Sequence, residues 1–218
     1  MLPQPPKKKP VNEAPGQTKR PRQQASEALV RRIFETAARM FIENGYAVSM
    51  DQIAAAAGAG KQTIYRRFGS KESLFLAVVD RQVQRLAETA RLEEAKDANP
   101  IEALKESCRT LLDFMLNRDM IRLQRIFVAE AGRFPNIGEY FENCMAPFTA
   151  VLQRLLWSAT ASGRLRKLSP EQLVTHLIGA IAGWPVRQAM LGIDPFPGPE
   201  AREAYFEAAW DLFLKGAG

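Results

Sequence analysis

The fold of this chain is decided by residues 49–71, SMDQIAAAAGAGKQTIYRRFGSK. After Ser49 the apolar residues recur at helical spacing, and Ser49 followed three residues later by Gln52 is the pattern of a capping box at a helix start. Gly58 interrupts this helix where a turn residue with positive φ would suit. Residues 61–68 then form a second short helix, with its apolar side chains four residues apart. The stretch therefore predicts a helix-turn-helix.

The second helix of this motif carries polar side chains on its outer face. Side chains of this kind donate hydrogen bonds to phosphates and base edges, and the second helix of a helix-turn-helix enters the major groove of DNA. The residues predicted to read base edges or to lie beside them are Lys61, Gln62, Thr63 and Arg66. The residues predicted to contact phosphates are Tyr65, Arg67 and Lys71, together with Ser49 at the start of the first helix. The predicted partner is double-stranded DNA.

The run TIYRRFGSKESLF, residues 63–75, resembles the most characteristic stretch of the TetR-type (tetracycline-repressor-like) regulators, and the similarity covers residues 27–80. The residues that carry the resemblance are Ala37, Phe41, Gly45, Tyr46, Ile53, Ala54, Gly58, Lys61, Thr63, Ile64, Tyr65, Phe68, Lys71, Leu74 and Phe75. Residues 125–135, RIFVAEAGRFP, resemble one subset of the ligand domains of that family. One departure is Gly60, where the family usually has Ser or Thr. A side-chain cap worth about 1 kcal/mol is absent there, and so is one expected phosphate contact.

The net charge of +6 is concentrated at the start of the chain. Residues 1–24 hold six Lys or Arg residues and one Glu, so the rest of the chain is nearly neutral. We expect these residues to be a disordered, basic, Pro-rich arm that is either a solvated tail or adds phosphate contacts. The arm lacks the apolar segment of a secretory signal, and the longest apolar run, residues 177–186, is too short to span a bilayer. The sequence predicts a cytoplasmic protein with no membrane partner.

Helical periodicity extends over almost the whole chain, and no long segment alternates as a strand does. The first helix is expected at residues 26–44. A long helix of roughly 24 residues starts after Ser70 and, at 1.5 Å per residue, spans about 36 Å. Later helices are expected near residues 101–117, 119–133, 137–162, 170–191 and 199–215. A kink is expected at Pro147.

The predicted fold is all-α and has two parts after the arm. Residues 25–70 form a three-helix DNA-binding domain that contains the helix-turn-helix. Residues 71–218 form the long connecting helix and a C-terminal helical bundle for effector binding and dimerisation.

The sequence offers no arrangement of catalytic side chains. The string GAGKQT is not a phosphate-binding Walker A loop, because Ala55 and Gln62 stand where Gly and Ser or Thr are required. His176 is the only histidine, which excludes a multi-histidine metal site. Cys108 and Cys144 lie in helical patterns that favour reduced, buried thiols over a disulfide. We expect no enzyme activity, no metal and no cofactor.

Aromatic and Met residues are abundant in the C-terminal half. They are either plain core or the lining of an apolar effector pocket, which the resemblance implies at this place. The candidate pocket residues are Phe114, Met115, Arg118, Arg122, Phe127, Glu130, Phe148, His176 and Trp184. The polar members of this set are candidates for orienting a small hydrophobic effector.

The last two helices carry small residues and a broad apolar face, respectively. These features either pack within one subunit or, as the resemblance implies, form a four-helix interface between two copies of the chain. The candidate interface residues are Gly179, Gly183, Phe206, Trp210 and Phe213.

Together these observations and the resemblance predict a homodimeric transcriptional repressor that a small hydrophobic effector releases from its operator. By this hypothesis the effector shifts the connecting helix and changes the separation of two heads that would otherwise match groove sites about 34 Å apart. The alternative is a ligand-free, DNA-bound structural or cell-division adaptor of the same fold. A third hypothesis is an enzyme with an accessory DNA-binding head.

Overall fold

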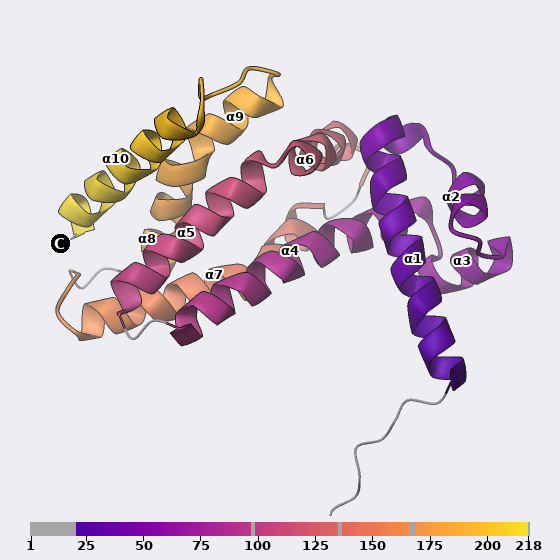
Figure 1. Ribbon diagram of the computed structural model, residues 1–218, viewed down its shortest axis with the longest axis horizontal. Helices are drawn as coiled ribbons and strands as arrows, with labels where there is room; N and C mark the ends of the chain where they lie inside the picture. The colour runs from indigo at the N-terminus through magenta and orange to yellow at the C-terminus, as the bar shows by residue number, and fades with distance from the viewer. Residues whose placement is uncertain (1–20, 97–98, 135–136, 166–168, 218) are drawn as a thin grey trace, which may run out of the picture.

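The computed structural model describes residues 21–96, 99–134, 137–165 and 169–217, and within these ranges it contains helices and turns but no strand. Figure 1 shows a small helical head at one end of an elongated helical body. The head consists of α1 (Pro21–Asn44), the short 3-10 helix η1 (Gly45–Ala47), α2 (Met50–Ala56) and α3 (Lys61–Phe68). The all-α fold predicted from the sequence is confirmed.

The body begins with α4 (Lys71–Lys96), which runs from the head alongside α7 (Figure 1). The elements that complete the body are α5 (Pro100–Leu116), α6 (Arg118–Glu130), α7 (Ile137–Ala161), α8 (Pro170–Ile178), the π-helical turn η2 (Gly179–Gly183), α9 (Trp184–Met190) and α10 (Pro199–Ala217). These bounds lie close to those expected from periodicity. No helix in the described part of the chain is long and apolar enough to cross a bilayer.

The first helix begins five residues earlier than expected, at Pro21. Pro suits the first position of a helix, because its missing N–H would have no helical partner there. Residues 21–24, which the sequence analysis assigned to the arm, therefore belong to α1. Residues 1–20, the remainder of that predicted arm, lie outside the described residues.

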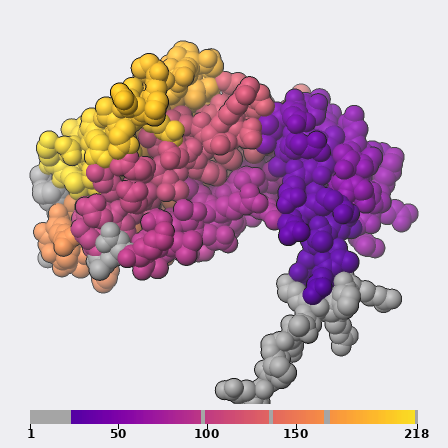
Figure 2. Space-filling view, in the orientation of Figure 1, coloured from indigo at the N-terminus to yellow at the C-terminus, as the bar shows by residue number. Residues whose placement is uncertain are grey.

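The interior of the head continues into the body. The ring of Phe41 on α1 packs edge-on against Phe75 on α4, with centroids 5.2 Å apart. The same apolar cluster extends along α4 through Val79 and Val83 to Leu123 on α6. In the space-filling view the head abuts the body directly (Figure 2). The long helix is thus shared by both parts, and a displacement of α6 would act on residues that support the head.

The helix expected at residues 170–191 is interrupted by the π-helical turn η2. Pro185, which follows at the start of α9, lacks an N–H and cannot donate to a carbonyl one turn earlier. A wider turn before the proline accommodates this missing bond. In contrast, α7 contains Pro147 and is helical on both sides of it.

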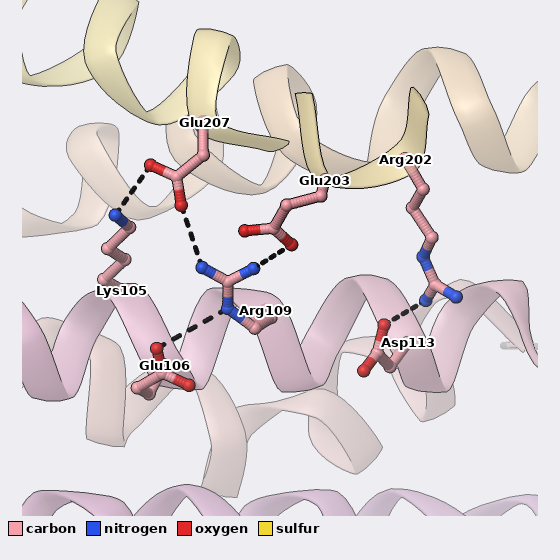
Figure 3. Close-up of polar contacts among 7 residues, drawn as sticks. All are labelled: Lys105, Glu106, Arg109, Asp113, Arg202, Glu203 and Glu207. Carbon is pink, nitrogen blue, oxygen red and sulfur yellow. Dashed lines mark hydrogen bonds and ion pairs between the residues drawn. The ribbon is translucent and has the colours of Figure 1, made fainter. Parts of the chain in front are cut away.

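Ion pairs attach α10 to α5 (Figure 3). Glu207 accepts hydrogen bonds from Lys105 Nζ at 2.7 Å and from Arg109 Nη2 at 2.9 Å, and Arg109 also pairs with Glu203. The Arg109 guanidinium lies 4.4 Å from the centre of the Phe206 ring. Pairs at this exposure are each worth little because water screens them. They lie beside Phe206, which is buried in the core on the same side of α10.

Candidate nucleic-acid interface and ligand cavity

The predicted capping box at the start of α2 is present. Ser49 Oγ accepts a hydrogen bond from the Gln52 backbone N–H at 3.2 Å, and Gln52 Oε1 accepts one from the Ser49 N–H at 2.8 Å. These bonds satisfy backbone donors that a helix start leaves unpaired. The Ser49 hydroxyl is exposed, and its own proton remains available to a phosphate oxygen.

The turn between α2 and α3 depends on Gly58, whose φ is +61°. Behind the turn, the Arg32 Nε of α1 donates to the Ala57 carbonyl at 2.7 Å. This contact fixes the helix-turn-helix to the first helix of the head. Sequence analysis did not find Arg32, because nothing in the local pattern of α1 distinguishes it from the other exposed basic residues.

Helix α3, which the sequence predicts to enter the major groove, has the two faces that its sequence predicts. Ile64 is fully buried, and the Phe68 ring packs edge-on against Phe34 of α1 at 5.4 Å. The exposed side chains on the outer face are Lys61, Gln62, Tyr65, Arg66 and Arg67. Thr63 is half-buried. At its first turn α3 has no side-chain cap, since Gly60 is the N-cap residue.

Two of the predicted DNA contacts already have protein partners. Lys61 Nζ donates to Asp51 Oδ2 of α2 at 2.5 Å, and this hydrogen bond raises the pKa of Lys61. Lys71 Nζ donates to the Tyr46 carbonyl at 2.7 Å and lies 4.2 Å from the centre of the Tyr46 ring. Lys71 therefore holds the start of α4 against η1, a structural task that the sequence did not reveal.

An apolar cavity of about 240 Å³ lies between α4, α5, α6 and α7. Its lining includes three of the residues predicted for a pocket: Phe114, Met115 and Phe127. The lining residues that sequence analysis missed are Val79, Val83, Met120, Leu123, Gln124, Val128, Phe141 and Met145. Val128 and Phe141 are exposed and mark the side on which the cavity opens. Apolar residues at helical spacing point inward, but the spacing does not say whether the space they face is filled.

Gln124 supplies the cavity with a polar side chain among apolar neighbours. Its Nε2 donates to the Met115 carbonyl at 3.1 Å. This bond joins α6 to the end of α5 and leaves the amide oxygen to accept from a ligand. Within the described residues, no group of three or more His, Cys, Asp or Glu side chains could hold a metal ion.

The remaining predicted pocket residues do not line this cavity. Phe148 is fully buried in the body core, and His176 is exposed on α8. Trp184 packs against Phe196 and Tyr205 on the outside of the bundle. These residues do lie on helices, as their spacing predicts. The spacing does not tell which neighbouring helix, or which open space, each side chain faces.

The three charged residues predicted for the pocket lie elsewhere too. Arg118 and Arg122 lie on the opposite face of α6, in a separate groove. Glu130 pairs with Arg133, three residues later in the chain, at 3.2 Å. Burying a charged side chain in an apolar cavity is costly unless a hydrogen-bonding or oppositely charged partner lies inside it, so such side chains usually point away.

The cysteines are both free thiols and both buried, as predicted. Burial raises the pKa of Cys108. Burial and the nearby Asp80 carboxylate raise the pKa of Cys144 to about 12. Tyr140, one turn before Cys144, donates its hydroxyl to the Leu76 carbonyl at 2.6 Å and so joins α7 to α4.

The predicted interface residues divide into two groups. Gly179 and Gly183 are exposed, with open space where a Cβ would stand. Phe206 and Trp210 are buried in the core of the subunit, and Phe213 is half-buried beside Trp210. The assignment of Phe206 and Trp210 to a surface is therefore wrong, because α10 turns its aromatic face toward α5. The exposed residues of α10 include Ala204, Ala208 and Leu212, which is 72% exposed, beside the charged residues Asp211 and Lys215.

Comparison with known proteins finds one family model that matches the head and the start of α4, and another that matches most of the body. Residues 33–78 match the model of the bacterial regulatory proteins of the tetR family. Residues 102–216 match the model of the AefR-like transcriptional repressor C-terminal domain.

Individual relatives give the same result. An uncharacterized HTH-type transcriptional regulator of Mycobacterium tuberculosis, Rv1255c, is 32% identical over 79% of this chain and 78% of its own length. A putative TetR-family regulator from Mesorhizobium loti superposes with a TM-score of 0.79, covering 89% of this chain and 98% of its own at 25% identity. The flavonoid-responsive regulator FrrA superposes with a TM-score of 0.65, covering 88% and 97% at 28% identity.

These matches cover both the head with its helix-turn-helix and the helical body. The relatives and the matching family models are transcriptional regulators and not enzymes. This chain belongs to the TetR family and is a DNA-binding transcriptional regulator.

Proposed function

We propose that this regulator is a repressor that leaves its operator when a small hydrophobic effector enters the cavity between α4, α5, α6 and α7. The observation that carries the proposal is the shared use of α4. Val79 and Val83 of this helix line the cavity, and Phe75, one turn earlier, packs against the head. A ligand that displaces α4 at the cavity would also change the position of the head.

On the DNA side, the proposal assigns base-edge contacts to Lys61, Gln62, Thr63 and Arg66. Phosphate contacts are assigned to Ser49, Tyr65, Arg67 and Lys71. Support comes from the exposure of most of these side chains on one short helix and from the capping geometry that leaves the Ser49 proton available. A single recognition helix reads only a few base pairs, so two copies of the head are expected to act together.

The second copy is proposed to bind through η2 and the outer face of α10. Gly179, Ala180 and Gly183 are exposed there and allow close approach of a second helix pair. Leu212 of α10 and Trp184 of α9 supply exposed apolar surface. A homodimer of this kind places two heads on one operator in the cytoplasm.

The cavity restricts the chemistry of the effector. Its volume of about 240 Å³ lies below the usual range of ligand pockets, about 300–1,000 Å³, and Gln124 offers an amide among apolar walls. This environment favours a compact, uncharged molecule with a single hydrogen-bonding group, because burying an unpaired charge is costly. The similarity to a flavonoid-responsive regulator is consistent with an effector that is mainly hydrophobic.

The test begins with selection of an operator from random DNA by the purified protein. A thermal-shift screen of compact, uncharged hydrophobic compounds then finds ligands, and each ligand is titrated into the protein–operator complex. We expect at least one ligand that raises the melting temperature and weakens operator binding by about 5 to 150-fold. Val128→Trp, which would block the open side of the cavity, should abolish this response and leave operator binding unchanged.

The ligand-free adaptor remains the alternative. It would be supported if no compound both stabilised the protein and changed operator affinity, and if binding sites were scattered over a chromosome. A ligand whose effect persists undiminished in Val128→Trp would contradict the assignment of the cavity.

A further inference from the structure

A second and larger hollow lies on the far side of α6. This groove has a volume of about 760 Å³ and runs between α6, the segment 191–198 that follows α9, and the first turn of α10. Figure 1 shows α9 beside α6, and residues of the two helices are in contact. Neither the cavity nor the DNA-binding surface includes any of its lining residues.

The periodicity of α6 places the two hollows on opposite faces. Met120, Leu123, Gln124, Phe127 and Val128 face the cavity. The residues that face the groove are Arg118, Ile121, Arg122 and Arg125, which have the same helical spacing but are displaced by about half a turn. The helix is thus apolar toward one hollow and basic toward the other.

Four arginines line the groove, and two of them are already engaged. Arg125 donates to the carbonyls of Met190 at 3.1 Å and Ala189 at 2.8 Å, which ties α6 to the end of α9. Arg202 pairs with Asp113 (Figure 3). These contacts fix the walls of the groove.

The other two arginines have no such contacts. Arg118 and Arg122 are one turn apart, and the side chain of neither forms a hydrogen bond or ion pair with any residue that the structure describes. One acidic residue, Asp194, is among the described residues that line the groove, and it lies in the segment after α9. Two uncommitted guanidinium groups beside a hollow of this size provide about ten N–H donors for an anion.

The rest of the groove is apolar. Ile121 of α6 and Ile193, Pro195 and Phe196 of the facing segment line it, and Ile193 is 52% exposed. Exposed apolar surface next to unpaired arginines suits a molecule that has an anionic head and an apolar body.

We propose that this groove is a second ligand site, which binds amphipathic carboxylates. The carboxylate accepts hydrogen bonds from Arg118 and Arg122, and the apolar part of the ligand lies against Ile121, Ile193 and Phe196. Such a ligand contacts α6 and the 191–198 segment together, and so it stabilises α6 in the position seen here. The proposal goes beyond the repressor function and does not depend on a ligand in the cavity.

The test uses decanoate, below the concentration at which it forms micelles, and decanol as its uncharged counterpart. Binding to the full-length protein is followed by displacement of the fluorescent anion 1-anilinonaphthalene-8-sulfonate. We expect decanoate to bind more tightly than decanol. In the double variant Arg118→Gln/Arg122→Gln, the dissociation constant for decanoate should rise at least tenfold, while that for decanol should change less than twofold.

Three further variants determine whether decanoate binds in the groove or elsewhere on the protein. Ile193→Glu alters an exposed side chain and places a negative charge in the groove, so it should weaken decanoate binding without risk to the fold. Arg85→Gln/Arg91→Gln removes two exposed arginines from α4 and should leave binding unchanged, which controls for overall charge. Val128→Trp blocks the cavity and should also leave decanoate binding unchanged.

Two outcomes would overturn the proposal. One is decanoate binding of wild-type strength in both Arg118→Gln/Arg122→Gln and Ile193→Glu. The other is loss of decanoate binding in Val128→Trp, which would place the ligand in the cavity. Because an uncharged effector is tested separately by its action on the operator complex, failure of the groove leaves the proposed repressor function standing.

Discussion

The ring of Phe134, which follows α6, packs edge-on against the ring of Tyr46 in η1, with centroids 5.4 Å apart. The Tyr46 ring also contacts the Phe75 ring, with centroids 5.6 Å apart, and the Tyr46 backbone carbonyl accepts a hydrogen bond from Lys71 Nζ. Helix α6 borders both hollows, and this aromatic contact links the segment that follows it to the junction of the head with α4. Because a packed interface of this kind transmits displacement, a ligand that moves α6 should also move the head.

This link predicts the behaviour of Phe134→Ala. Phe134 is buried, so the variant should lose about 3–5 kcal/mol of unfolding free energy by loss of the ring and creation of a cavity. The effector should also have less influence on operator binding, because the ring contact between the segment after α6 and Tyr46 is lost. Urea unfolding and operator titrations with and without effector measure the two effects. Phe141→Ala, at an exposed position of the cavity, serves as the control and should leave head stability intact.

The recognition helix predicts two kinds of DNA-binding variant. Gln62→Ala and Arg66→Ala should each cost about 1–3 kcal/mol of operator binding and relax base preference at particular positions. Arg67→Ala should weaken binding to all sequences alike and reduce the salt dependence by about one unit of slope. Binding to a randomised operator library, read by sequencing at two salt concentrations, distinguishes these outcomes. Unchanged base preference in both of the first two variants would refute their assignment.

The missing cap of α3 predicts a gain of stability. Gly60 has φ −67° and ψ 141°, which any residue adopts, and the nearest atom to an added Cβ would be Thr63 Oγ1 at 3.6 Å. Gly60→Ser should therefore stabilise the protein by a few tenths of a kcal/mol, up to about 1 kcal/mol, and add a phosphate donor. Gly58→Ser is the matched control. It should destabilise the protein, because φ at Gly58 is +61°. Thermal melting and operator titration measure both variants.

If the exposed residues of η2 and α10 form the proposed dimer interface, substitutions there should separate the two subunits. Leu212→Glu and Gly183→Leu change exposed positions, so they should yield folded monomers that bind the operator weakly. Trp210→Glu should instead unfold the subunit, because it buries a charge in the core. Sedimentation velocity and circular dichroism separate dissociation from unfolding. A wild-type protein that sediments as a monomer at micromolar concentration would contradict the dimer.

Because the Cys144 thiol is buried, we expect the protein to lose stability in alkaline solution. Its pKa in the folded protein is raised to about 12, above the ordinary value of an exposed thiol, about 8.5. The folded state therefore binds the proton more tightly, and this contribution to stability is complete below about pH 8.5 and is lost as the pH rises toward 12. Unfolding free energy measured between pH 7 and 10 should fall less steeply in Cys144→Ala. At pH 8 the thiol should resist a disulfide reagent until the protein unfolds.

Much of the local structure follows from the sequence by itself. The capping box at Ser49, the left-handed turn at Gly58 and the two faces of α3 depend on residues within one or two turns of each other, and all three are present. Most helix bounds were predicted within a few residues for the same reason, although α1 begins five residues earlier than expected and η2 interrupts the helix expected at residues 170–191. The resemblance in residues 63–75 identified the family because the motif is contiguous.

Tertiary structure alone decided which inward-facing residues surround empty space. Phe114 lines the cavity while Phe148 is closed in the core, although both lie on apolar faces of helices. Local periodicity tells which way a side chain points along its own helix. It does not tell how far away the opposite helix lies.

Contacts between distant residues were likewise beyond the sequence. The Arg32 contact with the Ala57 carbonyl and the Lys71 contact with the Tyr46 carbonyl each join positions 25 residues apart. Trp210 is buried because α10 packs its aromatic face into the core of the body, and Glu203 and Glu207 of the same helix pair with Arg109 of α5, more than ninety residues earlier in the chain. The amphipathic pattern of a helix defines its apolar face, but only the packed fold determines whether that face meets its own subunit or a second copy.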